Sequence, residues 1–362
     1  MKKKIIILIC IILIIGIIAS IAIYTYLRYS DNNDIDTDNY KNTEELSTVL
    51  TLEDKIQDDT IWCGTFQLLW NDLKNDLAKQ DIVFSPQLEV VENLNKETFT
   101  VDDLSEKYYY KKIGTPSIEL KQEIENAIKD KFNETSDILD DFDWNTKNPK
   151  DYFLYVMLKK EFQFEKEFEE LDNGKFGSYD NVSFFGIKSD SEEEELRNQV
   201  EVLYYNSKND FAIKLITKQE DEVILCKNPK GNTFNEIFNN IKENESNYDG
   251  YKNLIEGELL KVPNIKIKEK NEFPELYNKS FYFSNGDSYR IEKAIQTIQF
   301  ELDRVGGKVK SESGMMVRKN AIIATDEIRE FALDDEFAIF LIENGKENPY
   351  FAGKISDITK FQ

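Results

Sequence analysis

Alternating apolar and polar residues predict a strand, a long loop and two further strands near the end of the chain. Residues 298–302 read Ile-Gln-Phe-Glu-Leu, so the three apolar side chains share one face of an extended chain and the two polar ones take the other. Gly306-Gly307 interrupts this pattern, and 308–317 resumes a period of two. Two apolar runs follow, Phe337–Ile342 and Tyr350–Ile355, with Gly, Asn and Pro turn residues between them.

The rest of the chain mixes helical and extended patterns. Apolar residues recur at helical spacing in Leu52–Gln80, Ser117–Phe132 and Thr233–Lys242, and a helical turn is expected at Phe273–Tyr277. Strands are predicted at Asp81–Pro86, Tyr152–Leu158, Ser178–Ile187 and Leu259–Ile267, and a hairpin at Gln199–Ile216. Tyr152–Leu158 is almost wholly apolar, as in a strand buried on both faces. The combination predicts an α+β chain.

The N-terminus predicts attachment to a membrane. The apolar run Ile5–Ile23 is about as long as the ~20 residues with which a helix crosses a bilayer. We expect an uncleaved transmembrane anchor at 1–27, with the rest outside the cytoplasm because Lys2–Lys4 favour a cytoplasmic N-terminus. A cleavable signal ending at Ser20-Ile21-Ala22, followed by secretion, is the alternative. Residues 28–50 are polar and acidic, as in a flexible tether, and 51–362 make up the remaining domain.

Composition argues against several classes of function. A formal net charge of −23 argues against nucleic acid as a partner. The chain has no histidine, which removes Ser-His-Asp and Cys-His catalysis and histidine-bearing zinc sites. We therefore assign no catalytic residue, metal or cofactor. Cys10, Cys63 and Cys226 have no metal-ligand spacing; Cys10 lies in the apolar run, and the sequence leaves a Cys63–Cys226 disulfide open.

Several motifs resemble, in chain order, those of the serpins, a family of conformational-trap protease inhibitors. The hinge run DRVGGKV at 303–309, the returning strands EFALDDEFAIFLIEN at 330–344 and the ending PYFAGKISDI at 349–358 follow that family's C-terminal order. Upstream, Phe84-Ser85-Pro86 follows a long helix, as in serpins. The family's Phe-x-Gly-x-Trp-x-x-x-Phe motif corresponds here to Phe162, Phe164 and Phe168, with Phe164 replacing its Trp and Val156 replacing a nearby Asn. The chain resembles a divergent bacterial member.

The resemblance implies a fold. A serpin-like chain has a large, mostly antiparallel central sheet with helices, a C-terminal barrel-like sheet and an exposed reactive loop. It also implies a partner, a target protease of the serine or cysteine type. The protease cuts the loop, the freed hinge inserts into the central sheet, and the acyl-enzyme is trapped. No catalytic residue of the inhibitor is needed, so the chain is not expected to be an enzyme.

Two groups of residues would carry this activity. The hinge comprises Gly306, Gly307, Val309, Ser311 and Ser313, because from Gly307 onward the small or apolar residues alternate on one face while Lys308, Lys310 and Glu312 take the other. The scissile region is expected at Arg318, Lys319, Asn320 and Ala321.

Two other functions stay open. Lys308 and Lys310 occupy hinge positions where the family prefers small residues, which favours a non-inhibitory binding or structural domain at the cell surface on the same scaffold. An enzyme on an unrelated α+β fold is the third interpretation.

Overall fold

The computed structural model describes residues 46–145, 148–219, 221–307 and 328–362. All of these residues fall within the unit Lys41–Gln362. The predicted anchor at 1–27 and most of the tether lie outside them, and both stay predictions. Within the described ranges, no helix is long and apolar enough to cross a membrane.

Among the described residues, the largest sheet has seven strands and is formed mainly by the C-terminal half of the chain. Its order is β1 (Ser47–Thr48), β2 (Thr60–Cys63), β19 (Phe351–Ile355), β18 (Phe337–Glu343), β10 (Asp221–Lys227), β9 (Asp210–Ile216) and β8 (Val200–Ser207). Neighbours are antiparallel except β1 and β2. The apolar run of β18 is buried throughout because it lies in the middle of this sheet.

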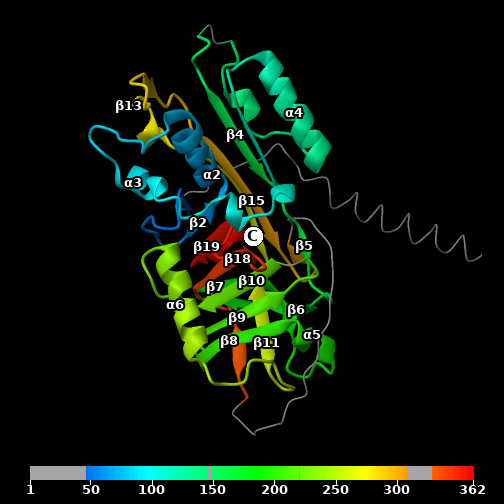
Figure 1. Ribbon diagram of the computed structural model, residues 1–362. Helices are drawn as coiled ribbons and strands as arrows, with labels where there is room; N and C mark the ends of the chain where they lie inside the picture. The colour runs from blue at the N-terminus through cyan, green and yellow to red at the C-terminus, as the bar shows by residue number, and fades with distance from the viewer. Residues whose placement is uncertain (1–45, 146–147, 220, 308–327) are drawn as a thin grey trace, which may run out of the picture. The chain divides into compact units, whose positions relative to one another are not determined.

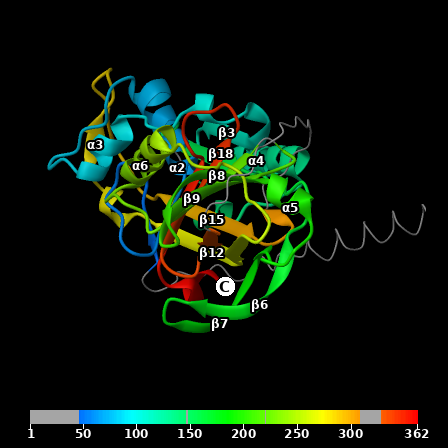
Figure 2. The same cartoon turned by 90° about the horizontal axis from the view of Figure 1, so that it is seen from below.

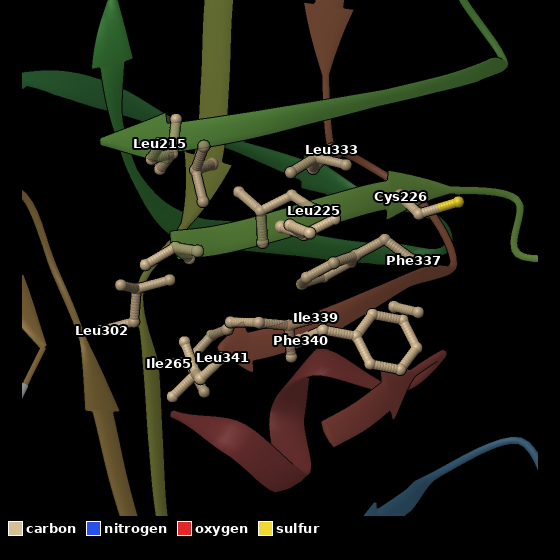
Figure 3. Packing of buried hydrophobic residues seen from close by; sticks show 14 of the residues in the cluster. Leu215, Leu225, Cys226, Ile265, Leu302, Leu333, Phe337, Ile339, Phe340 and Leu341 are labelled. Atoms are coloured by element: carbon tan, nitrogen blue, oxygen red, sulfur yellow. The ribbon is translucent and has the colours of Figure 1, made fainter. Parts of the chain in front are cut away.

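The main core lies on both sides of the seven-stranded sheet. Helix α6 (Phe234–Asn247) covers one side, where the rings of Phe234 and Phe238 lie against Phe340 of β18. Leu215, Leu225 and Leu341 belong to the same core as Ile265 and Leu302, which come from a second sheet (Figure 3).

The second sheet is the counterpart of the predicted central sheet, and it is divided. One part has the order β12 (Ile265–Glu272), β15 (Ile295–Leu302), β16 (Gly306–Gly307) and β5 (Phe162–Gln163). The other part is the antiparallel pair β3 (Tyr109–Gly114) and β4 (Phe153–Leu158). The several-sheet α+β arrangement agrees with the predicted fold class, but β4 and β15 are not paired with each other within the described residues, so the central sheet is in two parts.

Two smaller groups of strands complete the β structure. A four-stranded sheet has the order β17 (Glu330–Ala332), β11 (Leu259–Pro263), β7 (Tyr179–Ile187) and β6 (Glu169–Phe176), and a hairpin joins β13 (Ser280–Tyr282) to β14 (Ser288–Arg290). In both views β15 lies between helix α4 (Ile118–Phe132) and the β6–β7 pair (Figures 1 and 2).

The described residues form further helices besides α6. They are α2 (Thr65–Asp72), continued by the π-helical turn η1 (Leu73–Ala78), then α3 (Glu89–Asn95), α4 (Ile118–Phe132) and α5 (Glu194–Asn198), with 3-10 turns η2 (Val101–Asp103), η3 (Glu106–Tyr108), η4 (Leu139–Asp141), η5 (Pro274–Leu276) and η6 (Ile358–Phe361). α4 begins at Ser117, whose hydroxyl accepts a hydrogen bond from Leu120 N at 3.1 Å, and ends at Asn133 in the left-handed region. Its buried face packs on Phe153 and Tyr155 of β4.

Three predicted elements differ from the structure. The helix expected at Leu52–Gln80 begins only at Thr65, and Thr60–Cys63 is strand β2. Leu259–Ile267 forms two strands in different sheets. Asp81–Pro86 is not a strand, because the side-chain amide of Asn95 bonds both backbone groups of Ile82, with N–O distances of 3.3 and 2.8 Å.

Strand β4 also differs from its prediction. Phe153 and Tyr155 are buried beneath α4, whereas Leu154, Val156 and Leu158 are only half-buried. The strand is therefore not buried on both faces.

Candidate functional site

A tight hairpin follows β15 and reverses the chain at the predicted hinge. The Asp303 carboxylate accepts hydrogen bonds from Val305 N at 2.8 Å and Gly306 N at 3.3 Å. Asp303 N donates to Gly306 O at 3.0 Å. These bonds reverse the direction of the chain after Asp303, so that it runs back beside β15.

The returning residues form β16 between two other strands. Gly307 pairs with Leu302 of β15 on one side and with Phe162 of β5 on the other, and Gly306 pairs with Gln163. The hairpin is held on the β5 side as well, because Phe164 N donates to Val305 O at 3.0 Å. The first two hinge residues are therefore already an inner strand of the central sheet.

Phe162 is the nearest obstacle to a side chain at both hinge positions. Gly306 has a φ of 152°, and a Cβ there would lie 2.2 Å from Phe162 O. A Cβ on Gly307 would lie 2.4 Å from the Phe162 ring. The glycine pair thus lets the chain pass between β15 and β5, where any side chain would collide.

Beyond Gly307, the edges of β4 and β15 have no strand partner within the described residues. β4 pairs only with β3, and β15 pairs only with β12 apart from the single Leu302–Gly307 position. We call these two edges, Phe153–Leu158 and Ile295–Glu301, the sheet seam. β5, which follows β4 after three residues, pairs with one side of β16, and β15 pairs with the other. A continuation of β16 beyond Gly307 would therefore run along the sheet seam.

A buried glutamine of β15, Gln296, lies at the sheet seam, and only the nitrogen of its side-chain amide forms hydrogen bonds within the described residues. Gln296 Nε2 donates to Cys63 O at 3.0 Å and to Thr65 Oγ1 at 2.8 Å, which ties β15 to the start of α2. Its Oε1 is buried and accepts no hydrogen bond from the described residues. A buried amide oxygen without a donor is costly, so this atom can accept a group that arrives later.

The far end of the predicted reactive loop is held by Arg329. Its guanidinium lies against the fully buried Glu258 carboxylate, with Nε–Oε1 and Nη2–Oε2 distances of 2.6 and 3.0 Å. It also donates to Tyr251 O at 2.6 Å and Asn253 O at 2.7 Å. Burial acts to lower the pKa of Arg329, but the hydrogen bonds and charge of Glu258 raise it, so the side chain stays charged.

Few of the predicted site residues can be placed. Gly306 and Gly307 lie together beside Phe162. Phe162, Phe164 and Phe168 form one buried aromatic cluster. The remaining predicted residues, Val309, Ser311, Ser313, Arg318, Lys319, Asn320 and Ala321, lie outside the described residues.

The described cysteines are free thiols. Cys63 is in β2 and Cys226 is in β10, three strands apart in one sheet. At about 4.8 Å per strand the separation is about 14 Å, whereas a disulfide needs Cα atoms within about 7 Å. The structure thus decides against the bond that the sequence left open. No group of three or more potential metal ligands occurs within the described ranges.

Gln296 and Arg329 were missed by sequence reasoning. The partner residues of Gln296 are more than 230 positions away along the chain, and Glu258 is 71 positions from Arg329. Local patterns carry no signal of such pairs. The only hint is an arginine two residues before the Phe-Ala pair, near the end of a polar stretch.

Comparison with known proteins gives structural matches alone. No family model matches the sequence, and no curated protein matches it. Among solved structures, the thermophilic serpin tengpin in its native state matches with 15% identity and a TM-score of 0.46, over 88% of this chain and 96% of that one. Serpin48 from the insect Tenebrio molitor matches with 10% identity and a TM-score of 0.46, over 83% and 92%. Human thyroxine-binding globulin complexed with thyroxine matches with 12% identity and a TM-score of 0.46, over 82% and 91%.

All three are serpins. What these matches give is a similarity to serpin structures at low sequence identity.

Proposed function

We propose that this serpin-like protein inhibits a serine or cysteine protease by adding its own loop as a strand to the central sheet. The observation that supports this best is the pairing of Gly307 with Leu302 on one side and Phe162 on the other. A chain that leaves β15, reverses and starts a strand between two others is prepared for strand addition. The next residues of that strand would run along the sheet seam.

The observed pairing predicts the register of the added strand. Continued from Leu302–Gly307, it sets Val309 opposite Phe300, Ser311 opposite Ile298 and Ser313 opposite Gln296. These three β15 residues are all buried. The hinge residues that sequence alternation assigned to the inner face would therefore meet the inner face of β15.

The same register keeps the hinge charges in water. Lys308 would lie opposite Glu301 and Lys310 opposite Gln299, on the face of β15 that is exposed or half-buried. A slip by one residue would turn the lysines inward, and each buried unpaired charge costs several kcal/mol, roughly. The unusual lysines are thus compatible with insertion in one register.

The seam supplies a driving force. The half-buried Leu154, Val156 and Leu158 of β4 would be covered, and the two unpaired strand edges would gain backbone hydrogen bonds. Before cleavage the loop is held at both ends, by the Asp303 hairpin and by Arg329. Cleavage near Arg318–Ala321 would free the hinge side to add to the sheet while the other side stays bound.

The trapping step uses the chemistry of the protease. The protease nucleophile forms the acyl bond with the loop, and strand addition carries that bond away from where it formed. This protein contributes no catalytic group, which fits a chain without histidine. The target would be met outside the cytoplasm if residues 5–23 anchor the chain in the membrane, and in the medium if they are removed.

Incubation with a panel of serine and cysteine proteases tests the proposal. We expect a complex that survives SDS, with the mass of the protease plus the chain up to the cut. Gly306→Val should convert the protein from inhibitor to substrate, because the hinge could no longer pass Phe162 O while the loop is still cut. Cutting of the unsubstituted protein near Arg318–Ala321 by every protease of the panel, without any stable complex, would contradict inhibition.

A binding or structural domain is the second candidate, favoured by Lys308 and Lys310 in the hinge. The two functions predict different effects of loop cleavage on the melting temperature. An inhibitor should melt at a much higher temperature after the loop is cut, because the added strand completes the sheet. A binding domain should melt at the same temperature before and after cutting.

A further inference from the structure

A buried cluster of charges lies two residues before the position that receives the hinge. Lys160 precedes Phe162, the β5 partner of Gly307, and its side chain is completely buried. Lys160 Nζ forms an ion pair with Asp221 and lies 3.6 Å from a Glu343 carboxylate oxygen. The rings of Tyr108 and Tyr350 flank the ammonium group, at 4.5 and 4.8 Å from their centroids. The cluster connects the β4–β5 segment to the seven-stranded sheet.

The cluster holds two carboxylates for one ammonium. Asp221 is the first residue of β10 and pairs directly across the sheet with Glu343, the last residue of β18. Like charges on paired positions of neighbouring strands repel each other. Burial lowers the pKa of Lys160, although Asp221 and Glu343 act to raise it. With Lys160 protonated and both carboxylates ionised, the cluster carries one negative charge in a place shielded from water.

Glu343 is the carboxylate that stays ionised. Burial acts to raise its pKa, but hydrogen bonds from the hydroxyl and backbone N–H of Ser105 stabilise the anion, and the net pKa is lowered. Lys346 adds a positive charge nearby.

Asp221 is the carboxylate that titrates. Burial raises its pKa to about 6, although Lys160 and the Tyr350 hydroxyl, which donates to Asp221 Oδ1 at 3.2 Å, act to lower it. Asp221 Oδ2 is buried and accepts no hydrogen bond from the described residues, which disfavours the ionised form. Burial raises the pKa of Tyr350 well above its usual value, so the phenol stays neutral, and Cys63, which also faces Tyr350, has a raised pKa as well.

We propose that this cluster is an acid-responsive clamp on the hinge-receiving end of the central sheet. One proton on Asp221 makes the cluster electrically neutral, with Lys160 balanced by Glu343, and holds β5 more firmly against the seven-stranded sheet. At neutral pH the excess negative charge loosens the same connection. The effect on β5 concerns the intact protein alone; slower strand addition in mild acid would follow only if the proposed function is correct.

The direction and size of the expected pH effect follow from the linkage between protonation of Asp221 and opening of β5. A carboxyl group whose pKa is raised in the folded state makes that state more stable in acid, and the gain disappears as pH rises through the raised value. Opening of β5 exposes Asp221 and returns its pKa to about 4. Between pH 7.5 and pH 5, protection of the segment against opening should therefore rise about tenfold, with a midpoint near pH 6.

Hydrogen exchange of the intact protein tests the clamp. Exchange is followed in peptides covering 159–164 from pH 5 to 7.5, and each rate is divided by the intrinsic rate at that pH. Asp221→Asn should remove the pH dependence, and Glu343→Gln should move its midpoint to lower pH because the like charge is gone. Asp334→Asn is the matched control: Asp334 pairs at 2.6 Å with Lys227 at the other end of β10, so the dependence at 159–164 should persist.

Two results would overturn the clamp. One is protection of 159–164 that does not change with pH in the unsubstituted protein. The other is an unchanged midpoint in Glu343→Gln, which also decides the matter if Asp221→Asn does not fold. A clamp that behaves as expected in a protein that traps no protease would leave this inference standing and refute inhibition alone.

Discussion

Phe162 sets the identity of both hinge residues, since its carbonyl oxygen excludes a side chain at 306 and its ring excludes one at 307. Gly307→Val should therefore lower the free energy of unfolding by about 1–3 kcal/mol through overpacking. Urea denaturation measures this loss. Phe162→Ala in the same chain should recover part of it, because the ring that collides is gone. Losses that simply add in the double variant would mean that the two residues do not interact.

Arg329 and Arg304 are both paired with a glutamate, but in different surroundings. Glu258 is fully buried beside Arg329, whereas Arg304 and Glu167 are both more than a third exposed. Arg329→Gln should cost about 3–5 kcal/mol because it leaves a buried carboxylate unpaired. Arg304→Gln should cost less than about 1 kcal/mol.

Thermal denaturation of the two variants gives the comparison. Arg329→Lys should not restore stability, because an ammonium group cannot make the paired contacts of the guanidinium with Glu258. Equal losses for Arg329→Gln and Arg304→Gln would show that burial of Glu258 contributes nothing.

At the scale of elements, local sequence patterns correctly predict the helices and strands whose positions are determined by residues close in the sequence. α4 begins at the residue that caps it, the hairpin β8–β9 follows its turn, and β18 and β19 match their apolar runs. The prediction is wrong where distant side chains or sheet membership decide. The Asn95 side chain forms hydrogen bonds with the backbone groups of Ile82, which prevents a strand there. The chain passes from one sheet to another at Pro263-Asn264.

The candidate site divides in the same way. Gly306 and Gly307 can be found from the sequence because glycine pairs mark special backbone positions. Phe162, which makes them necessary, is about 140 positions away and carries no local sign of that role. The Lys160 cluster is hidden for the same reason, because a lysine between Lys159 and Glu161 gives no indication of a carboxylate 61 positions later.

The added strand should have one side-chain contact that identifies its register. Ser313 would lie opposite Gln296, whose Oε1 has no donor among the described residues. Ser313→Ala should therefore reduce the increase in melting temperature after cleavage. Ser311→Ala, opposite the apolar Ile298, should leave that increase unchanged, and calorimetry of the cut proteins compares the two. Equal effects would contradict the register.

For the whole molecule, the prediction concerns where the domain lies. Lys2–Lys4 are the stronger basic flank of the apolar run, so the domain should face outward. A protease added to intact cells should remove a C-terminal tag. A tag that is digested only after lysis would show that the orientation is wrong.

The hinge pairing has a kinetic consequence. Beginning a new strand in a sheet is slow because two distant segments must first meet and lose their conformational freedom. Here that first meeting has already happened, since Gly306 and Gly307 are paired on both sides before any bond is cut. Each further residue would add to an existing strand nucleus, so the strand would grow residue by residue from Gly307. After cleavage, strand addition would therefore compete with hydrolysis by the protease without having to pass through its own slowest step.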